Sequence, residues 1–174
     1  MSVDSLRSAV RDVPDFPKPG ILFRDITPVL SHPDLFQESI RLLSETAAGK
    51  KIDKVVGIDA RGFIFAAAVA DRLHAGFVPI RKRGKLPWRT RGLSYSLEYG
   101  ESEVEIHEDA VLPGEKVLLV DDLLATGGTS AAAIQLLEQL GADLVAVAFL
   151  IELRSLNGRA LLGNHPVVSI IDYP

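Results

Sequence analysis

Residues 117–129 read Val-Leu-Leu-Val-Asp-Asp-Leu-Leu-Ala-Thr-Gly-Gly-Thr. Four apolar residues lead into Asp121 and Asp122, and a turn of small residues precedes a helix-forming stretch. A short continuous apolar run is typical of a strand that is buried on both faces of a parallel sheet. We therefore expect both acids at the carboxyl end of that strand, where open α/β sheets bind ligands. Residues 125–129 would then place backbone N–H groups and a helix N-terminus around an anion.

An acid pair beside an anion-binding turn requires a ligand that satisfies both. A phosphorylated ribose does so, because it offers hydroxyl groups to the acids and a phosphate to the turn, with a divalent cation nearby. The alternative is a strand end with a solvated acid pair and a flexible turn. The order of strand, acid pair, small-residue turn and helix favours the sugar phosphate.

The rest of the chain alternates between strand-like and helix-like segments. This alternation predicts an α/β fold with a twisted, mostly parallel sheet flanked by helices on both faces. The expected strands are residues 54–59, 77–81, 116–120, 144–152 and 167–171, and the expected helices are residues 3–12, 34–48, 62–75 and 129–140. Asp34 is expected to cap one helix, and Gly76 and Gly141 to end two others.

The composition restricts the class of protein. The chain has 174 residues, which predicts one domain over residues 1–174. It contains no cysteine, which fits a reducing cytoplasm, and no apolar run long enough to span a membrane. Its net charge of −4 argues against nucleic-acid binding. Residues 1–33 are expected to form an N-terminal arm that is irregular over residues 13–33, and residues 82–101 a loop with a β-hairpin.

A second strand-to-helix turn lies at residues 55–62, Val-Val-Gly-Ile-Asp-Ala-Arg-Gly. Its amide groups and the guanidinium of Arg61 could bind another anion. The alternative is an ordinary turn with an exposed arginine.

Residues 81–91 carry six basic side chains and no acid. This run could be a solvated face, or a mobile flap whose cations stabilise a pyrophosphate leaving group; nucleic-acid binding is a weaker third interpretation.

The signature at residues 117–129 resembles that of type I phosphoribosyltransferases, which use phosphoribosyl pyrophosphate. The resemblance implies that Asp121 and Asp122 bind the ribose hydroxyls, near a Mg²⁺ held mainly by substrate oxygens and water. It assigns the 5′-phosphate to Ala125, Thr126, Gly127, Gly128 and Thr129. It assigns pyrophosphate to Asp59, Ala60, Arg61, Arg81, Lys82 and Lys85, and it implies a cis peptide bond between Asp59 and Ala60.

Two further segments resemble the adenine-specific members of that family. Residues 95–100, Tyr-Ser-Leu-Glu-Tyr-Gly, match a segment in which Glu98 would act as acid or base on the purine. Residues 16–28 resemble an N-terminal hood over the base. This resemblance implies that Leu22, Phe23 and Arg24 contact adenine, together with Leu153 from the other side.

The expected reaction joins adenine to phosphoribosyl pyrophosphate and gives AMP and pyrophosphate. Glu98, Asp121, Asp122 and Arg61 are its expected catalytic residues. The family resemblance also implies a homodimer and a flexible flap at residues 82–101. Two alternatives remain: a relative that uses xanthine, hypoxanthine or guanine, and a non-catalytic regulator that senses phosphoribosyl pyrophosphate.

Overall fold

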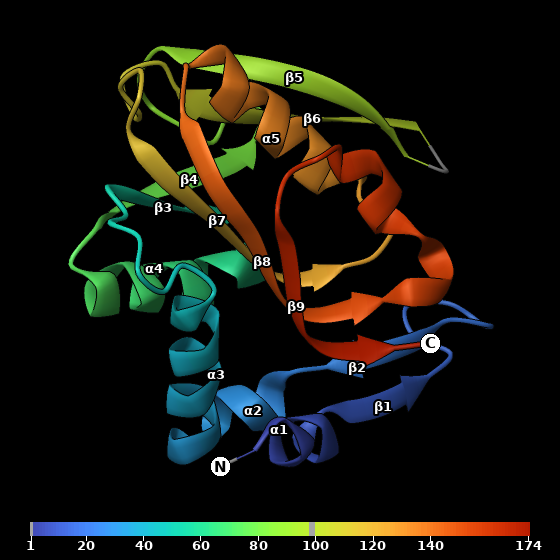
Figure 1. The fold of residues 1–174 in the computed structure, drawn as a ribbon. Coiled ribbons are helices and arrows are strands. Elements are labelled where there is room, and N and C mark those ends of the chain that lie inside the picture. Colours follow the sequence, from blue (N-terminus) through green and yellow to red (C-terminus); the bar gives the residue numbers. More distant parts are fainter. Residues whose placement is uncertain (1, 98–99) are drawn as a thin grey trace.

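The computed structural model describes residues 2–97 and 100–174. Its main sheet consists of β3 (Lys54–Ile58), β4 (Gly76–Lys82), β5 (Thr90–Leu97), β6 (Gly100–His107), β7 (Lys116–Leu124), β8 (Asp143–Leu153) and β9 (Val167–Tyr173). The strand order is β5-β6-β4-β3-β7-β8-β9 (Figure 1). Strands β4, β3, β7, β8 and β9 pair in parallel, whereas β6 is antiparallel to β4 and β5. This confirms the predicted α/β fold with a mostly parallel sheet.

Helices cover both faces of the sheet and create two apolar cores. The helices are α1 (Val3–Ala9), α2 (Thr27–Ser31), α3 (Pro33–Glu45), α4 (Arg61–Leu73) and α5 (Gly128–Gln139), with 3₁₀ helices η1 (Arg154–Leu156) and η2 (Gly158–Leu162). Phe65 of α4 packs on one face with Val55 and Leu118. Leu137 of α5 packs on the other face with Leu119. The continuous apolar runs of the central strands thus bury both of their faces, as is typical of parallel strands.

The N-terminal arm is more regular than predicted. It contains an antiparallel pair, β1 (Arg11–Pro14) and β2 (Leu22–Asp25), and the short helix α2. The pair lies beside the carboxyl end of β9, and Figure 1 shows the two together near the C-terminus. The guanidinium of Arg24 stacks over the ring of Tyr173 at 3.9 Å from its centroid. This contact fixes the position of the arm relative to the sheet.

Two predicted helix boundaries are wrong. Asp34 is not the cap of α3: the N-cap is His32, with Pro33 at the first helical position, where proline is favoured because its missing N–H has no helical partner. Helix α4 ends at Leu73, and its C-cap His74 adopts a left-handed φ of 53°, whereas Gly76 already begins β4. The predicted role of Gly141 is confirmed, since it has a φ of +79° directly after the end of α5.

Candidate active site

Strand β7 extends beyond the predicted boundary, and this defines the position of the acid pair. Asp121 and Asp122 lie within β7 rather than after it, and Asp121 is still in register with Phe149 of β8. Pairing with β3 on the other side stops at Val120, opposite Gly57. The acids therefore lie where β7 has lost one neighbouring strand, which leaves that side of the backbone open to a ligand.

Asp121 is packed tightly against the start of α4. A β-carbon added to Gly62 would lie only 2.4 Å from Oδ1 of Asp121. The same oxygen accepts a hydrogen bond from the backbone N–H of Asp122 at 2.9 Å. Burial of the carboxyl group, followed by the negative charge of Asp122, raises the pKa of Asp121 well above its ordinary value. A ligand diol in the cavity would donate hydrogen bonds to this carboxyl group.

Asp122 is buried, with 6% of its surface exposed, and forms an ion pair with Arg61. The distance from Arg61 Nε to Asp122 Oδ2 is 2.7 Å. The guanidinium of Arg61 also lies 5.3 Å from the ring centroid of Phe23 in the N-terminal arm. The structure thus brings together the acid pair, the second predicted anion loop and the arm, which are far apart in the sequence.

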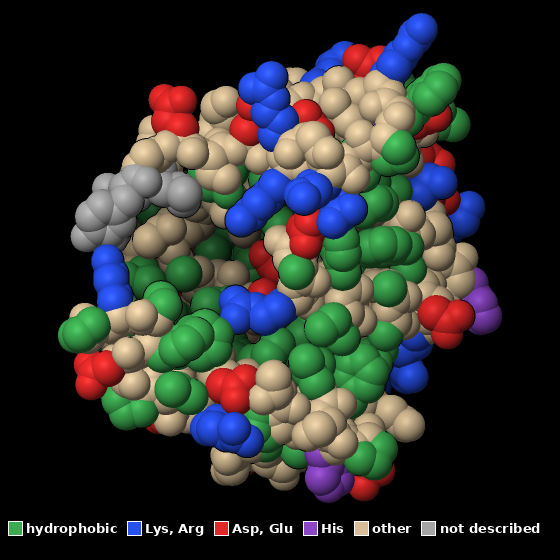
Figure 2. All heavy atoms as spheres, turned by 180° about the vertical axis from the view of Figure 1, so that it is seen from behind, with side chains coloured by type: hydrophobic (Ala, Val, Ile, Leu, Met, Phe, Trp, Pro, Cys, Tyr) green, Lys and Arg blue, Asp and Glu red, His purple; other side chains and the backbone are tan. Residues whose placement is uncertain are grey.

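The small-residue turn and the acid pair line one cavity of 370 Å³. Gly127 adopts a φ of +86°, which favours glycine, and α5 begins at Gly128. The lining residues are Ile58, Asp59, Ala60, Arg61, Asp121, Asp122, Leu123, Ala125, Thr126, Gly127, Gly128, Thr129 and Ser130. Figure 2 shows the hollow on this face of the molecule, with Lys and Arg side chains at its rim. The two predicted anion loops therefore face a shared space.

The peptide bond between Asp59 and Ala60 is cis, as predicted. Oδ2 of Asp59 accepts a hydrogen bond from Nε of Arg81 at 2.9 Å, so two of the residues assigned to pyrophosphate are in contact. Lys82 lines a smaller adjoining cavity of 90 Å³ together with Asp59 and Arg81. The carbonyl oxygen of Lys85 accepts a hydrogen bond from Nη1 of Arg81 at 3.2 Å. Lys85 itself is exposed and lines neither of these cavities.

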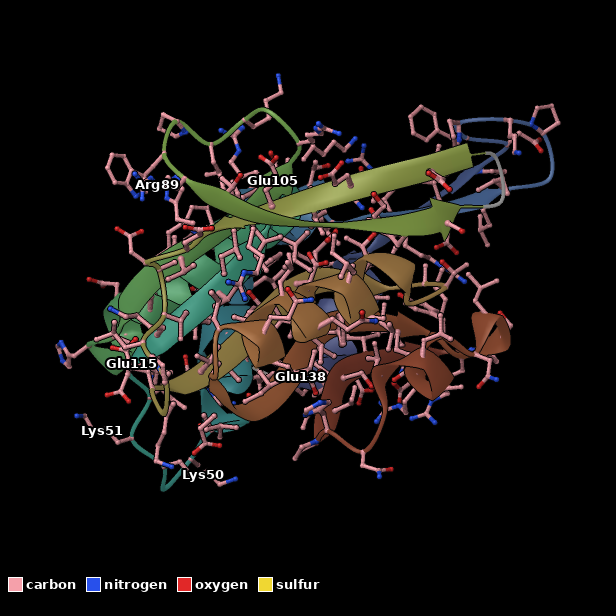
Figure 3. All side chains as sticks on the ribbon, turned by 90° about the horizontal axis from the view of Figure 1, so that it is seen from above. Lys50, Lys51, Arg89, Glu105, Glu115 and Glu138 are labelled. Atoms are coloured by element: carbon pink, nitrogen blue, oxygen red, sulfur yellow. The ribbon has the colours of Figure 1, made fainter. Side chains whose placement is uncertain are left out.

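The basic run is joined to β6, the acidic strand that follows it in the sequence, by an ion pair and a hydrogen bond. Arg83 forms an ion pair with Glu103 at 3.0 Å, and the N–H of Gly84 donates to Oε2 of Glu105, also at 3.0 Å. Figure 3 shows Glu105 beneath the loop that also carries Arg89. The asymmetry of charge along the sequence is therefore partly neutralised in space, where β6 carries acids toward the basic loop.

The residues assigned to the base do not line the cavity of 370 Å³, although Phe23 contacts Arg61, which does. Leu22 is exposed, and the ring of Phe23 packs edge-on against Phe16 with centroids 5.1 Å apart. Arg24 forms an ion pair with Asp12. Leu153 is partly buried against the core at the end of β8. Glu98, the expected acid or base, lies outside the described residues.

Sequence reasoning missed several residues that contact the turn at residues 125–129. Leu123 and Ser130 line the cavity, and Tyr95 accepts a hydrogen bond from Thr129 Oγ1 at 2.9 Å. Gly158 packs directly on the turn. Leu123 and Ser130 flank the signature, so extending the motif at both ends would have included them. Gly158 comes from a distant segment that no local pattern marks. Tyr95 begins the matched segment at residues 95–100, but its contact with the turn was not predicted.

The two carboxyl groups of the acid pair could coordinate a cation that takes only one or two of its ligands from the protein. Among residues 2–97 and 100–174, no group of three or more His, Cys, Asp or Glu side chains is arranged to hold a metal ion. Asp121 and Asp122 offer two carboxylates in one cavity. Mg²⁺ commonly binds one or two carboxylates and takes its other ligands from water and substrate phosphates. The residues present therefore fit Mg²⁺ bound together with a phosphorylated ligand.

No helix in the described part of the chain is long and apolar enough to cross a membrane.

Comparison with known protein families matches residues 25–166 to the family described as "Phosphoribosyl transferase domain". The chain belongs to this phosphoribosyltransferase family. The match contains the acid pair, both anion loops and the basic run, but it begins at the end of β2 and so leaves out most of the arm.

Individual relatives cover the family match and the arm. An adenine phosphoribosyltransferase of Mesorhizobium japonicum is 58% identical over 159 residues, which are 91% of this chain and 88% of the relative. The crystal structure of adenine phosphoribosyltransferase from Thermoanaerobacter pseudethanolicus superposes with a TM-score of 0.96 and 47% identity, covering 99% of this chain and 100% of that one. The enzyme of Saccharomyces cerevisiae, solved with an imino-altritol bisphosphate and adenine, has a TM-score of 0.91 and 43% identity, covering 97% of each chain.

Proposed function

We propose that the chain transfers the 5-phosphoribosyl group from phosphoribosyl pyrophosphate to adenine, giving AMP and pyrophosphate for purine salvage. The observation that carries the proposal is the shared cavity, in which Asp121 and Asp122 lie between the turn at residues 125–129 and the loop at residues 59–61. One anion site on each side of a diol-binding acid pair matches a ribose with a phosphate at one end and pyrophosphate at the other.

The 5′-phosphate is assigned to the start of α5. Ala125, Thr126, Gly127, Gly128 and Thr129 offer backbone N–H groups and one hydroxyl near the positive end of the helix dipole. Anchoring this phosphate holds the reacting carbon in place, so binding energy distant from the reaction lowers the barrier. Asp121 and Asp122 accept hydrogen bonds from the two ribose hydroxyls and fix the rotation of the ring.

Pyrophosphate is assigned to the cis-peptide loop and the basic run. Arg61 faces the cavity while paired with Asp122, and Arg81 is held by Asp59. We propose that Asp59, Ala60, Arg61, Arg81, Lys82 and Lys85 bind the leaving group. Positive charge placed where negative charge develops stabilises the transition state more than the ground state. Mg²⁺, when bound near Asp121 and Asp122, neutralises part of the charge on the pyrophosphate oxygens.

The base is assigned to the space between the arm and β8. We assign Leu22, Phe23 and Arg24 to one side of the base, as part of a hood formed by residues 1–33. Leu153 is assigned to the other side. Arg61 links this region to the acid pair, since it contacts both Phe23 and Asp122. We propose Glu98 as the acid or base on the purine, with residues 82–101 acting as a flap over the reaction.

We further propose a homodimer in the cytoplasm. Ile64 and Phe77 are exposed large apolar side chains on α4 and β4, and the ring of Phe77 packs edge-on against Phe63 at 5.6 Å. Trp88 is 60% exposed. A second copy that covers this apolar surface would remove it from water. The absence of cysteine suits a reducing compartment.

The decisive experiment supplies the purified protein with phosphoribosyl pyrophosphate, Mg²⁺ and one purine at a time. The expected result is AMP from adenine and little or no nucleotide from hypoxanthine, guanine or xanthine. Preferred use of another purine would reassign the base site. Binding of phosphoribosyl pyrophosphate without turnover of any purine would favour the regulator, and absence of binding would refute the sugar-phosphate site itself.

A further inference from the structure

Gly158 of η2 is in direct backbone contact with the turn assigned to the 5′-phosphate. A β-carbon added to Gly158 would lie 2.2 Å from the carbonyl oxygen of Ala125 and 2.9 Å from the amide nitrogen of Gly127. A β-carbon on Gly127 would lie 2.3 Å from the carbonyl oxygen of Gly158. There is no room for a side chain between the two segments. Because packed interiors transmit displacement, a movement of η2 would move the turn.

Arg159, the next residue, fastens η2 to the edge of the sheet. Its Nε donates to Oε1 of Glu152 at 3.1 Å, and its Nη2 also bonds to Oε2 of the same carboxylate. Nη1 donates to the carbonyl oxygen of Val167 at 2.7 Å, and Nη2 donates to Oγ of Ser169 at 3.0 Å. One planar guanidinium therefore joins η2 to β8 and β9 in a fixed orientation, which a lysine could not reproduce.

The carboxylate of Glu152 is suited to hold the guanidinium of Arg159 in place. It is 4% exposed, and Oγ of Ser169 lies 2.6 Å from its Oε2. Hydrogen bonds from Arg159, with a further contribution from Ser169, keep the pKa of Glu152 below its ordinary value against the opposing effect of burial. The carboxylate is thus charged at neutral pH, and the bidentate ion pair persists. Arg159 itself contacts protein atoms and does not line the 370 Å³ cavity.

We propose that Arg159 is a positioning residue for the 5′-phosphate: by holding η2 against β8 and β9, it keeps Gly158 on the turn and so sets the spacing of the amide groups at residues 125–129. The identity of the ligand rests on the proposed function, whereas the mechanical link rests on the contacts of Gly158 and Arg159.

The mechanical link is tested without ligand by hydrogen exchange of the full chain. Arg159→Met should speed exchange of the amides at residues 125–129. Arg154→Met is the matched control, because Arg154 lies in the adjoining η1 and bonds instead to Asp172 at 2.6 Å. The control should leave exchange at the turn unchanged. Wild-type exchange rates at the turn in Arg159→Met would overturn the proposal.

The consequence for binding is tested by calorimetry with two probes, phosphoribosyl pyrophosphate and pyrophosphate, both with Mg²⁺. Arg159→Met should bind the first about tenfold or more weakly, because small displacements of a positioning group have large effects, and the second as well as wild type does. An equal loss for both probes would indicate general damage and overturn the proposal. If the wild type failed to bind phosphoribosyl pyrophosphate, the proposed function would fail, and the exchange experiment would still decide the link.

In Arg159→Met the buried carboxylate of Glu152 loses its partner, and this stranded charge is itself destabilising. The double variant Glu152→Gln/Arg159→Met lacks both the guanidinium and the stranded charge, so it should fold more stably than Arg159→Met. It therefore separates the loss of the positioning contacts from the effect of the unpaired carboxylate. The selective loss of phosphoribosyl pyrophosphate affinity should remain. Recovery of wild-type affinity in the double variant would assign the effect to the stranded charge and overturn the proposal.

Discussion

Oγ1 of Thr129 lies 2.9 Å from the phenolic oxygen of Tyr95 and donates a hydrogen bond to it. Thr129 is in the first turn of α5, whereas Tyr95 belongs to the hairpin of β5 and β6. A β-carbon on Gly128 would lie 3.3 Å from the Tyr95 ring, so the ring stands directly beside the helix start. The hairpin whose first strand belongs to the expected flap is therefore attached to the expected phosphate site.

This bond predicts energetic coupling between the two side chains. In a double-mutant cycle of Tyr95→Phe and Thr129→Val, followed by urea denaturation, the coupling should be about 0.5–1.5 kcal/mol, the usual net value of one hydrogen bond. Strictly additive effects of the two substitutions on the free energy of unfolding would show that the bond contributes nothing.

Gly62→Ala should destabilise the protein although it lies in a helix. Alanine normally stabilises a helix interior by about 0.5–1 kcal/mol relative to glycine. Here the new β-carbon would lie 2.4 Å from Oδ1 of Asp121, and overpacking of this kind costs about 1–3 kcal/mol. Urea denaturation should show a net loss. The exposed Ala67 of α4 provides the comparison: Ala67→Gly should also lose stability, by about 1 kcal/mol, so only at Gly62 does alanine become the worse residue.

Asp121→Asn should stabilise the ligand-free protein while weakening ligand binding. The raised pKa of Asp121 means that ionisation of this carboxyl opposes folding. Below the unfolded pKa of about 3.9 the carboxyl is protonated in both states, so the advantage of asparagine is absent there. The advantage grows as pH rises from the unfolded pKa toward the folded pKa and stays constant above it. Thermal unfolding at pH 4 and pH 7 measures this, and a larger gain at pH 4 would contradict it.

Asp122→Asn should reduce turnover about 100-fold or more while the fold stays intact, because asparagine keeps the shape but loses the charge opposite Arg61. Steady-state kinetics with adenine and phosphoribosyl pyrophosphate measures the effect. Asp143→Asn is the matched control, since Asp143 forms an exposed ion pair with Lys116 far from the cavity. Near-normal turnover in Asp122→Asn would remove Asp122 from the mechanism.

Glu98→Leu should lower turnover by about 100-fold and change adenine affinity much less, because loss of an acid or base acts on the transition state. Turnover and equilibrium binding of adenine must be measured separately. Glu108→Leu, at an exposed position directly after β6 and outside the proposed flap, should leave both unchanged. A loss of adenine affinity with normal turnover would reassign Glu98 to binding.

The local units of the fold could be predicted because short-range patterns encode them. An apolar run followed by small residues and a helix-forming stretch predicted the start of β7 and both ends of α5 to within one residue, whereas β7 continues to Leu124, beyond its predicted end at residue 120. The position of Asp121 inside β7 could not be predicted, because it depends on where β3 stops on the neighbouring side. The arm was misjudged for a similar reason: its prolines indicated irregular chain, whereas β1 and β2 are held by contacts with β9.

The candidate site shows the same division. The acid pair and both anion loops were predicted because an apolar run leads into each and a helix-forming stretch follows. The contacts of Gly158 and Tyr95 with residues 127–129 could not be found in this way, because they join distant parts of the chain. Specific pairings between distant segments are properties of the packed structure, and a single sequence carries no local sign of them.

The stacking of Arg24 on Tyr173 has a consequence for how the protein matures. The arm that carries Arg24 rests on a ring of β9, which belongs to the far side of the fold in sequence terms. The arm can therefore take its position only once β9 has joined the sheet, so the proposed hood forms late in folding.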